Sequence, residues 1–101
     1  MYQVIKRDGQ VVDFNLSKIS AAIGKAFEAQ HKQYTQDILD LLALKVTSHY
    51  EPKIRDGKIA VEDIQDSVEA ILSEAGYADV SKCYILYRKQ RERIRNMKST
   101  I

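Results

Sequence analysis

The stretch that decides the fold spans residues 4–19 and reads VIKRDGQVVDFNLSKI. Two short runs that favour β-strands flank Asp8-Gly9, a dipeptide that tolerates the positive φ angles of a tight hairpin turn. Because strand side chains alternate, a two-residue loop here predicts that Ile5 and Val12 share one face of the hairpin, with Val4 on the other. Both faces are then partly apolar. Helices of the chain can cover one face, and the other is a candidate ligand surface.

A helix is expected directly after the hairpin, and its first turn carries a positive charge. Asn15 or Ser17 can cap this helix, because both side chains offer an oxygen to free backbone N–H groups. Lys18 then lies where the helix dipole disfavours a cation. A nearby anion would relieve this, and Lys6 and Arg7 on the hairpin add positive charge that suits a polyphosphate. The alternative is a solvated hairpin beside a solvated lysine, the more common outcome for so short a motif.

Length and composition indicate one soluble domain. A chain of 101 residues suits a single modest core, and 45% hydrophobic with 30% charged residues is typical of a globular protein. The net charge of +2 is too small to argue by itself for nucleic-acid binding. No apolar run reaches membrane-spanning length and no signal peptide is evident, which predicts a cytoplasmic protein. The single cysteine, Cys83, excludes an internal disulfide and a multi-cysteine zinc site.

Apolar residues at helical spacing predict four helices, over about 16–30, 35–50, 62–75 and 79–97. The second helix is expected to be well buried, with an apolar stripe that includes Leu41 and Leu44. The fourth is apolar nearly all round at Ile85 and Leu86, which predicts that it runs through the centre of a bundle.

Two further features bear on how these helices are joined and packed. Gly24, in the first helix, is interpreted as an ordinary tolerated glycine, with close packing of a partner as the less favoured alternative. Residues 58–61, Lys-Ile-Ala-Val, are short, apolar and partly β-branched. They could form a third strand that pairs with the hairpin.

The last predicted helix ends in a run of cations, namely Arg88, Lys89, Arg91, Arg93, Arg95 and Lys98. Most of them have a plain explanation, since cations stabilise the negative end of a helix dipole. A sharper hypothesis is that Arg88 or Lys89 reaches back to a bound phosphate. DNA binding by the tail is a third possibility, disfavoured by the low net charge and the lack of a helix-turn-helix pattern.

The motifs of common catalytic sites are missing from the sequence. It contains no G-x-x-x-x-G-K-[ST] or G-x-G-x-x-G phosphate loop, no H-E-x-x-H and no G-x-S-x-G. His31 and His49 have no companions at metal-ligand spacing. Nothing in the sequence therefore argues for catalysis by this chain alone or for a metal site.

Three blocks of the sequence closely resemble the ATP-cone domain, the allosteric activity module at the N-terminus of many ribonucleotide reductases. The blocks are V-x-K-R-D-G at 4–9 with F-N-x-x-K-I-x-x-A-I at 14–23, V-E-D-I-Q-x-x-V-E at 61–69, and Y-x-x-Y-R-x-x-R at 84–91. Together they cover nearly the whole chain. The second and third look most like the anaerobic, glycyl-radical (class III) reductases. A transcriptional repressor of reductase genes carries the same domain, but behind a zinc ribbon whose cysteines this chain lacks.

This resemblance implies an α+β fold in which a small β-sheet, the hairpin at 2–14 plus a short third strand, caps a four-helix bundle. Residues 1–101 would form one regulatory domain cut from an anaerobic ribonucleoside-triphosphate reductase. ATP or dATP, with Mg²⁺, would bind as effector, ATP favouring the active enzyme and dATP the inactive one through altered subunit association. The implied partners are the catalytic body and further copies of the domain. The alternatives are an interaction module with a degenerate nucleotide site, or the ATP-cone of a transcriptional regulator.

The resemblance also implies which residues bind the nucleotide. The phosphates would be bound by Lys6, Arg7 and Lys89, the nucleoside would be surrounded by Val4, Asn15, Lys18 and Ile19, and the phosphate side would be lined by Val61 and Gln65. Aerobic relatives often have an acidic residue at the position of Val12, a hydroxyl residue at that of Val61 and histidine at that of Gln65. Valine side chains form no hydrogen bonds, so base and ribose contacts do not carry over to Val12 and Val61.

Overall fold

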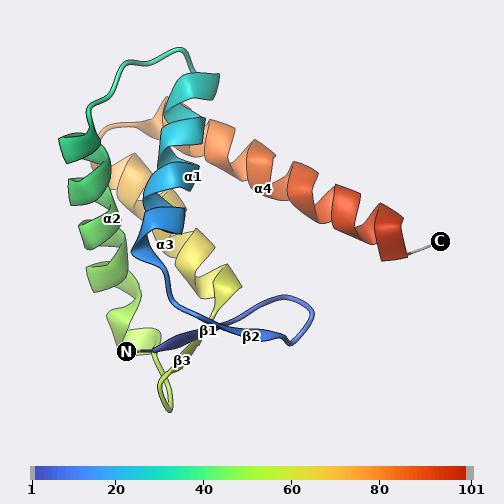
Figure 1. Ribbon diagram of the computed structural model, residues 1–101. Coiled ribbons are helices and arrows are strands. Elements are labelled where there is room, and N and C mark those ends of the chain that lie inside the picture. The colour runs from blue at the N-terminus through green and yellow to red at the C-terminus, as the bar shows by residue number, and fades with distance from the viewer. Residues whose placement is uncertain (1, 100–101) are drawn as a thin grey trace.

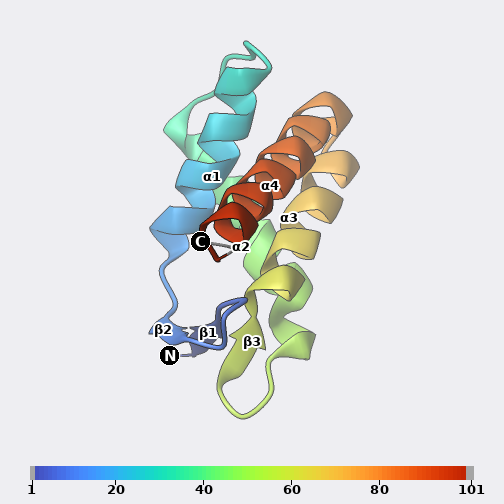
Figure 2. The ribbon, with the colours of Figure 1, turned by 90° about the vertical axis from the view of Figure 1, so that its right-hand side faces the viewer.

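The computed structural model describes residues 2–99, with the side chains of residues 2–92. Three short strands form one sheet in the order β2-β1-β3, and their bounds are Gln3–Ile5 for β1, Val11–Asp13 for β2 and Lys58–Ala60 for β3. The helices are α1 (Leu16–Ala29), α2 (Gln36–Tyr50), α3 (Val61–Glu74) and α4 (Ala78–Ser99), with a 3₁₀ turn, η1, at Glu51–Lys53. The sheet lies at one end of the four helices (Figures 1 and 2). The predicted α+β class, a small sheet at the end of a helical bundle, is confirmed.

The hairpin has a longer loop than predicted. The backbone N–H of Lys6 donates to the carbonyl of Gln10 at 2.8 Å, and that of Gly9 donates to the carbonyl of Lys6 at 2.9 Å. Gly9 has a φ of +90°, which is typical of a three-residue hairpin loop that ends on a left-handed glycine. The extra residue shifts the register, so that Val4 pairs with Val12. The prediction that Ile5 and Val12 share a face was therefore wrong.

The third strand forms as the sequence suggested, and it pairs in parallel with β1. Val4 in β1 lies opposite Ile59 in β3, and both are buried. Val61 leaves the strand and becomes the first residue of α3. This direct junction places the start of α3 beside the hairpin.

Sequence-local capping explains where the first two helices begin. The Asn15 side chain accepts a hydrogen bond from the Ser17 N–H at 3.0 Å, and Thr35 accepts one from the Ile38 N–H at 3.3 Å. Helix α3 ends at a glycine: Gly76 adopts a φ of +91° directly after the C-cap residue, Ala75. All four helices lie close to their predicted bounds.

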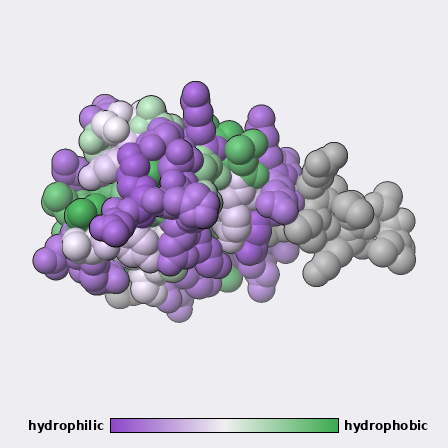
Figure 3. Space-filling view, turned by 90° about the horizontal axis from the view of Figure 1, so that it is seen from above, coloured by the Kyte–Doolittle hydropathy of each residue, from purple (hydrophilic) through white to green (hydrophobic). Residues whose placement is uncertain are grey.

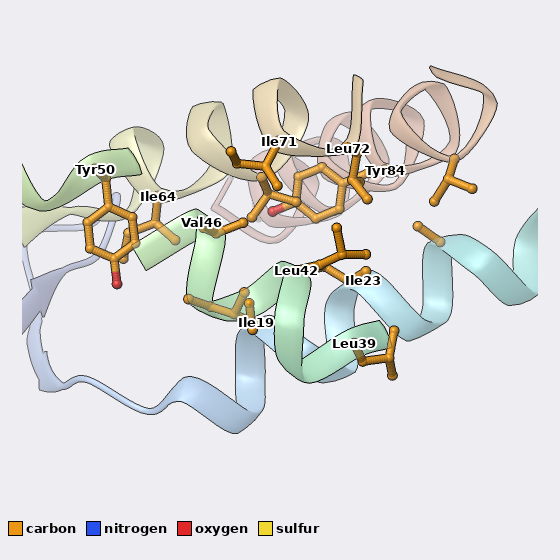
Figure 4. Packing of buried hydrophobic residues seen from close by; sticks show 14 of the residues in the cluster. Ile19, Ile23, Leu39, Leu42, Val46, Tyr50, Ile64, Ile71, Leu72 and Tyr84 are labelled. Carbon is orange, nitrogen blue, oxygen red and sulfur yellow. The ribbon is translucent and has the colours of Figure 1, made fainter. Parts of the chain in front are cut away.

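The hydrophobic core lies between the four helices and continues to the sheet (Figure 4). The buried face of α2 consists of Leu39, Leu42, Ala43, Val46 and Tyr50. Leu41 and Leu44 are instead 55% and 57% exposed, so their predicted place in the buried stripe was wrong. Leu41 follows Leu39 by only two residues, and residues at that spacing do not share a helix face.

Gly24 is a point of close packing, which was the less favoured of the two interpretations of this glycine. A Cβ atom at this position would lie 3.2 Å from Cδ1 of Leu39, tighter than ordinary van der Waals contact. The glycine therefore lets α1 approach α2 closely. Periodicity could not reveal this, because it reports which face of a helix is apolar and not how near the neighbouring helix lies.

Helix α4 lies across α1 and α3, and its C-terminal part extends beyond the bundle (Figures 1 and 2). Val80 and Tyr84 are buried in its first half, but Leu86 is 66% exposed. The prediction that this helix runs through the centre was therefore wrong. Seen from above, the surface is largely hydrophilic with separate apolar patches (Figure 3). The side chains of Arg93, Arg95 and Lys98 lie outside the described residues, and the hypotheses about them stay predictions.

Candidate functional site

Two adjoining cavities lie where the sheet meets α1, α3 and α4. The smaller, the apolar compartment, has a volume of about 200 Å³. Its hydrophobic wall residues include Val4, Val12, Phe14, Ile19, Ile64 and Val68, and its polar members include Asp13, Asn15, Lys6, Lys18 and Gln65. Several of these residues also belong to the protein core. An apolar cavity with a few polar groups is typical of a small-molecule site.

The larger cavity, the cationic compartment, has a volume of about 420 Å³. Its charged residues are Lys6, Arg7, Lys18, Lys25, Arg88, Arg91 and one carboxylate, Glu92. Five residues line both compartments, namely Lys6, Lys18, Val61, Gln65 and Tyr84. The two cavities are therefore neighbours with a shared wall, and a ligand with one apolar and one anionic end could occupy both.

The hairpin and the helices each contribute side chains to these walls at the sequence spacing typical of their secondary structure. Val4 and Lys6 are two residues apart on the hairpin and so point to the same face. The helices contribute residues three, four and seven apart, which lie on one face of a helix. These rows are Lys18, Ala22 and Lys25 from α1, Val61, Gln65 and Val68 from α3, and Tyr84, Arg88 and Arg91 from α4.

The two arginines nearest the shared wall are held by carboxylates. Arg7 lies 3.3 Å from Glu92 and 4.0 Å from Glu62, and it donates a hydrogen bond to Oε1 of Gln65 at 3.2 Å. Arg88 lies 2.9 Å from both Asp66 and Glu69. These contacts orient both guanidinium groups and partly neutralise their charge.

The lysines of the site differ from the arginines. Within residues 2–92, Lys6, Lys18 and Lys25 form no ion pair. Lys25 lies 5.9 Å from the centre of the Tyr87 ring, and Arg91 lies 5.8 Å from it. Uncompensated positive charge thus faces this cavity, and cation–π contacts help to position its outer cations.

The structure brings eight of the nine predicted site residues to these cavities. Val4, Asn15 and Ile19 line the apolar compartment, Arg7 lines the cationic compartment, and Lys6, Lys18, Val61 and Gln65 line both. Lys89 is exposed and lines neither cavity. The part that each residue plays in binding stays a prediction.

Sequence reasoning missed several residues of the walls. Lys25 and Arg91 were not assigned to the site, although each lies seven residues from another lining residue of its helix, Lys18 or Tyr84. That spacing is a signal that could have found them. Tyr84 also lines both cavities, and periodicity does not distinguish a core position from a cavity wall.

The part of the chain that the structure describes shows neither a metal site nor a membrane-spanning helix. No group of three or more His, Cys, Asp or Glu side chains there could hold a metal ion. None of the helices described is long and apolar enough to cross a membrane.

Comparisons with known proteins show which family the chain resembles. The family model of the ATP cone domain matches residues 2–93. The chain is 38% identical, over 101 residues, to the ribonucleoside-diphosphate reductase subunit alpha of Chlamydia muridarum, covering 92% of this chain and 10% of that protein. It is 42% identical to the vitamin B12-dependent ribonucleoside-diphosphate reductase of Thermoplasma acidophilum, over 95% of this chain and 13% of that protein. It is 30% identical to the anaerobic ribonucleoside-triphosphate reductase of Haemophilus influenzae, over 99% of this chain and 14% of that protein. The chain thus spans about a tenth of the length of the first of these relatives.

Proposed function

This chain belongs to the ATP-cone domain family, and from that premise we propose that its two compartments form one binding site for ATP or dATP. The observation that carries the proposal is the shared wall between an apolar cavity and a cationic one. The adenine and sugar would occupy the apolar compartment, and the triphosphate would extend into the cationic compartment. A nucleoside triphosphate is divided in a similar way, into an aromatic base whose faces can pack against apolar side chains and an anionic triphosphate.

In this proposal the free lysines bind the phosphates. Lys6, Lys18 and Lys25 would form charge-assisted hydrogen bonds with phosphate oxygens, and Arg7 would join them by exchanging a carboxylate for a phosphate. Mg²⁺ would be bound mainly by the triphosphate itself, as is usual for this ion. The base would pack against apolar side chains such as Val4 and Ile19.

We further propose that binding regulates a ribonucleotide reductase of which this chain forms a part. ATP would favour the active enzyme and dATP the inactive one, through altered subunit association. The effectors differ by one hydroxyl, and one hydrogen bond contributes only about 0.5–1.5 kcal/mol, a several-fold preference. The larger response must therefore come from how each nucleotide couples to assembly. Catalysis would lie in the remainder of the enzyme, in the cytoplasm.

A finer proposal concerns the reductase class. We infer an anaerobic ribonucleoside-triphosphate reductase, supported by the sequence blocks at 61–69 and 84–91 and by the Haemophilus influenzae relative. The relatives of higher identity reported above are diphosphate reductases. The proposed reductase class is therefore independent of the proposed nucleotide site and needs its own test. Assays of the full-length enzyme with nucleoside di- and triphosphates decide it, and reduction of diphosphates alone would refute it.

Calorimetric titration of this chain with ATP and with dATP, each with Mg²⁺, tests the binding site. Light scattering on the same samples reports association. We expect saturable binding of both nucleotides and a change of mass with dATP. If neither nucleotide bound to a folded sample of this chain or to the full-length enzyme, the nucleotide proposal would be refuted. An interaction module with a degenerate site would then be favoured.

The ATP-cone of a transcriptional regulator is a separate alternative. Its test is whether the full-length protein binds DNA rather than reducing nucleotides.

A further inference from the structure

Tyr84 occupies a special place between the two compartments. It lies on α4, is only 6% exposed, and lines both cavities. Its ring packs among the buried residues of the bundle, near Leu72, and its hydroxyl points along the bundle in the direction of Ile64 (Figure 4). The residue therefore combines a core ring with a polar atom at the wall that the two cavities share.

The hydroxyl of Tyr84 has no hydrogen-bond partner among the side chains and backbone of the described residues, which sets it apart from the other buried hydroxyls. Ser67 bonds to His49 at 2.8 Å, Ser81 donates to the carbonyl of Glu69 at 3.1 Å, and Tyr50 bonds to the hydroxyl of Tyr2. Within the same residues, no completely buried side-chain oxygen or nitrogen lacks a partner, so the Tyr84 oxygen keeps some accessible surface, in a residue that lines both cavities. A buried polar group needs a partner, and packing alone would be served by phenylalanine.

The neighbourhood of this hydroxyl determines what it can bind. Burial raises the pKa of Tyr84 to about 12, so the group stays protonated near neutral pH and can donate a hydrogen bond. Lys6 and Lys18 line the same two cavities, and they bring positive charge to the shared wall. An anionic oxygen is the acceptor that a neutral donor and two cations together favour.

We propose that the Tyr84 hydroxyl is a ligand contact that donates a hydrogen bond to the phosphate nearest the sugar of the bound nucleotide. This inference rests on the proposed nucleotide site, because the sugar–phosphate junction would lie at the shared wall. Tyr84 then contacts a phosphate group that ATP and dATP have in common. It contributes to affinity for both effectors and not to the choice between them.

The test is the variant Tyr84→Phe, which keeps the ring and removes only the oxygen. Calorimetric titrations with ATP, dATP and adenosine are compared with those of the unmodified chain, and thermal unfolding monitors the fold. We expect affinity for ATP and dATP to fall equally, by about ten- to a hundredfold, as for loss of a hydrogen bond to a charged group. Affinity for adenosine, which has no phosphate, is expected to be unchanged.

Tyr77→Phe is the matched control, since Tyr77 packs against Phe27 and lines neither compartment. Equal affinities for the Tyr84→Phe and unmodified chains would overturn the inference. A loss confined to ATP would overturn it in favour of a contact with the ribose hydroxyl, and an equal loss with adenosine would place the contact on the nucleoside. Failure of the unmodified chain to bind any nucleotide would instead overturn the proposed site itself.

Discussion

The apolar compartment is walled by residues of the hydrophobic core, whereas the cationic compartment is walled by long side chains that are partly solvated. Ile64 and Val68 in the apolar wall are 7% and 1% exposed. In the cationic wall, the side chains of Arg7 and Glu92 are 23% and 47% exposed. One half of the site is therefore part of the packed core, and the other half is lined by charged side chains with more contact to solvent.

Because of this difference, substitutions in the two walls have different effects on the stability of the fold. Removing apolar atoms from a buried wall costs stability, because water cannot compensate for the lost packing. Removing one of several like charges from a solvated wall costs little and can relieve repulsion. Substitutions in the apolar wall are therefore expected to lower the free energy of unfolding, whereas substitutions in the cationic wall are expected to change it little.

The largest effect is expected for Ile64→Ala in the apolar wall. The substitution removes buried methyl groups and should lower the free energy of unfolding by about 2–5 kcal/mol. Urea denaturation followed by circular dichroism measures it. Leu41→Ala is the matched control, because Leu41 is 55% exposed and its loss should change stability by less than about 0.5 kcal/mol. Similar losses for both variants would contradict the assignment of this wall to the core.

The next effect is expected for Lys6→Ala at the shared wall. Loss of a charged donor should weaken binding of both ATP and dATP about ten- to a hundredfold, with a change in unfolding free energy below about 0.5 kcal/mol. Titration calorimetry and urea denaturation of the same variant give both quantities. Lys45→Ala, an exposed position on α2, serves as control. A destabilised variant with unchanged affinity would reverse the distinction between the two walls.

The smallest effect is expected for Glu92→Gln. Glu92 holds Arg7 at 3.3 Å and would compete with a phosphate for it. A partly exposed ion pair contributes about 0.2–1 kcal/mol, so its loss should tighten ATP binding by up to about fivefold. Glu74→Gln, at the exposed end of α3, is the control in the titration. Weaker binding by Glu92→Gln would mean that this carboxylate supports the site rather than opposing the ligand.

Local patterns made much of this structure predictable. Asn15, one of the two candidates that the sequence offered, caps α1, and Thr35 caps α2, because a side-chain oxygen satisfies the first free N–H groups without help from distant residues. The third strand was recognised from four residues, but its parallel pairing with β1 was not. The hairpin register was wrong by one position, since an Asp-Gly pair permits loops of more than one length.

Cavity-lining residues that are close together in the sequence were easier to predict than those whose place depends on the packing of distant helices. Lys6, Arg7 and Lys18 come from adjacent segments, and all three line the cationic compartment. The run of cations on α4 left Arg88 and Lys89 as alternatives and the resemblance implied Lys89, whereas Arg88 and Arg91 line this cavity. The direction in which each cation points depends on the rotation of α4 against α1 and α3.

The order of the elements, the candidate helix caps and the concentration of positive charge beside the hairpin follow from the amino-acid sequence alone, because each depends on neighbours along the chain. Only the tertiary structure decided that Gly24 admits close contact between α1 and α2, that α4 extends beyond the bundle, and that Tyr84 lines two cavities. These features depend on distances between elements. Such distances follow from how whole surfaces pack together, and periodicity along one helix carries no record of them.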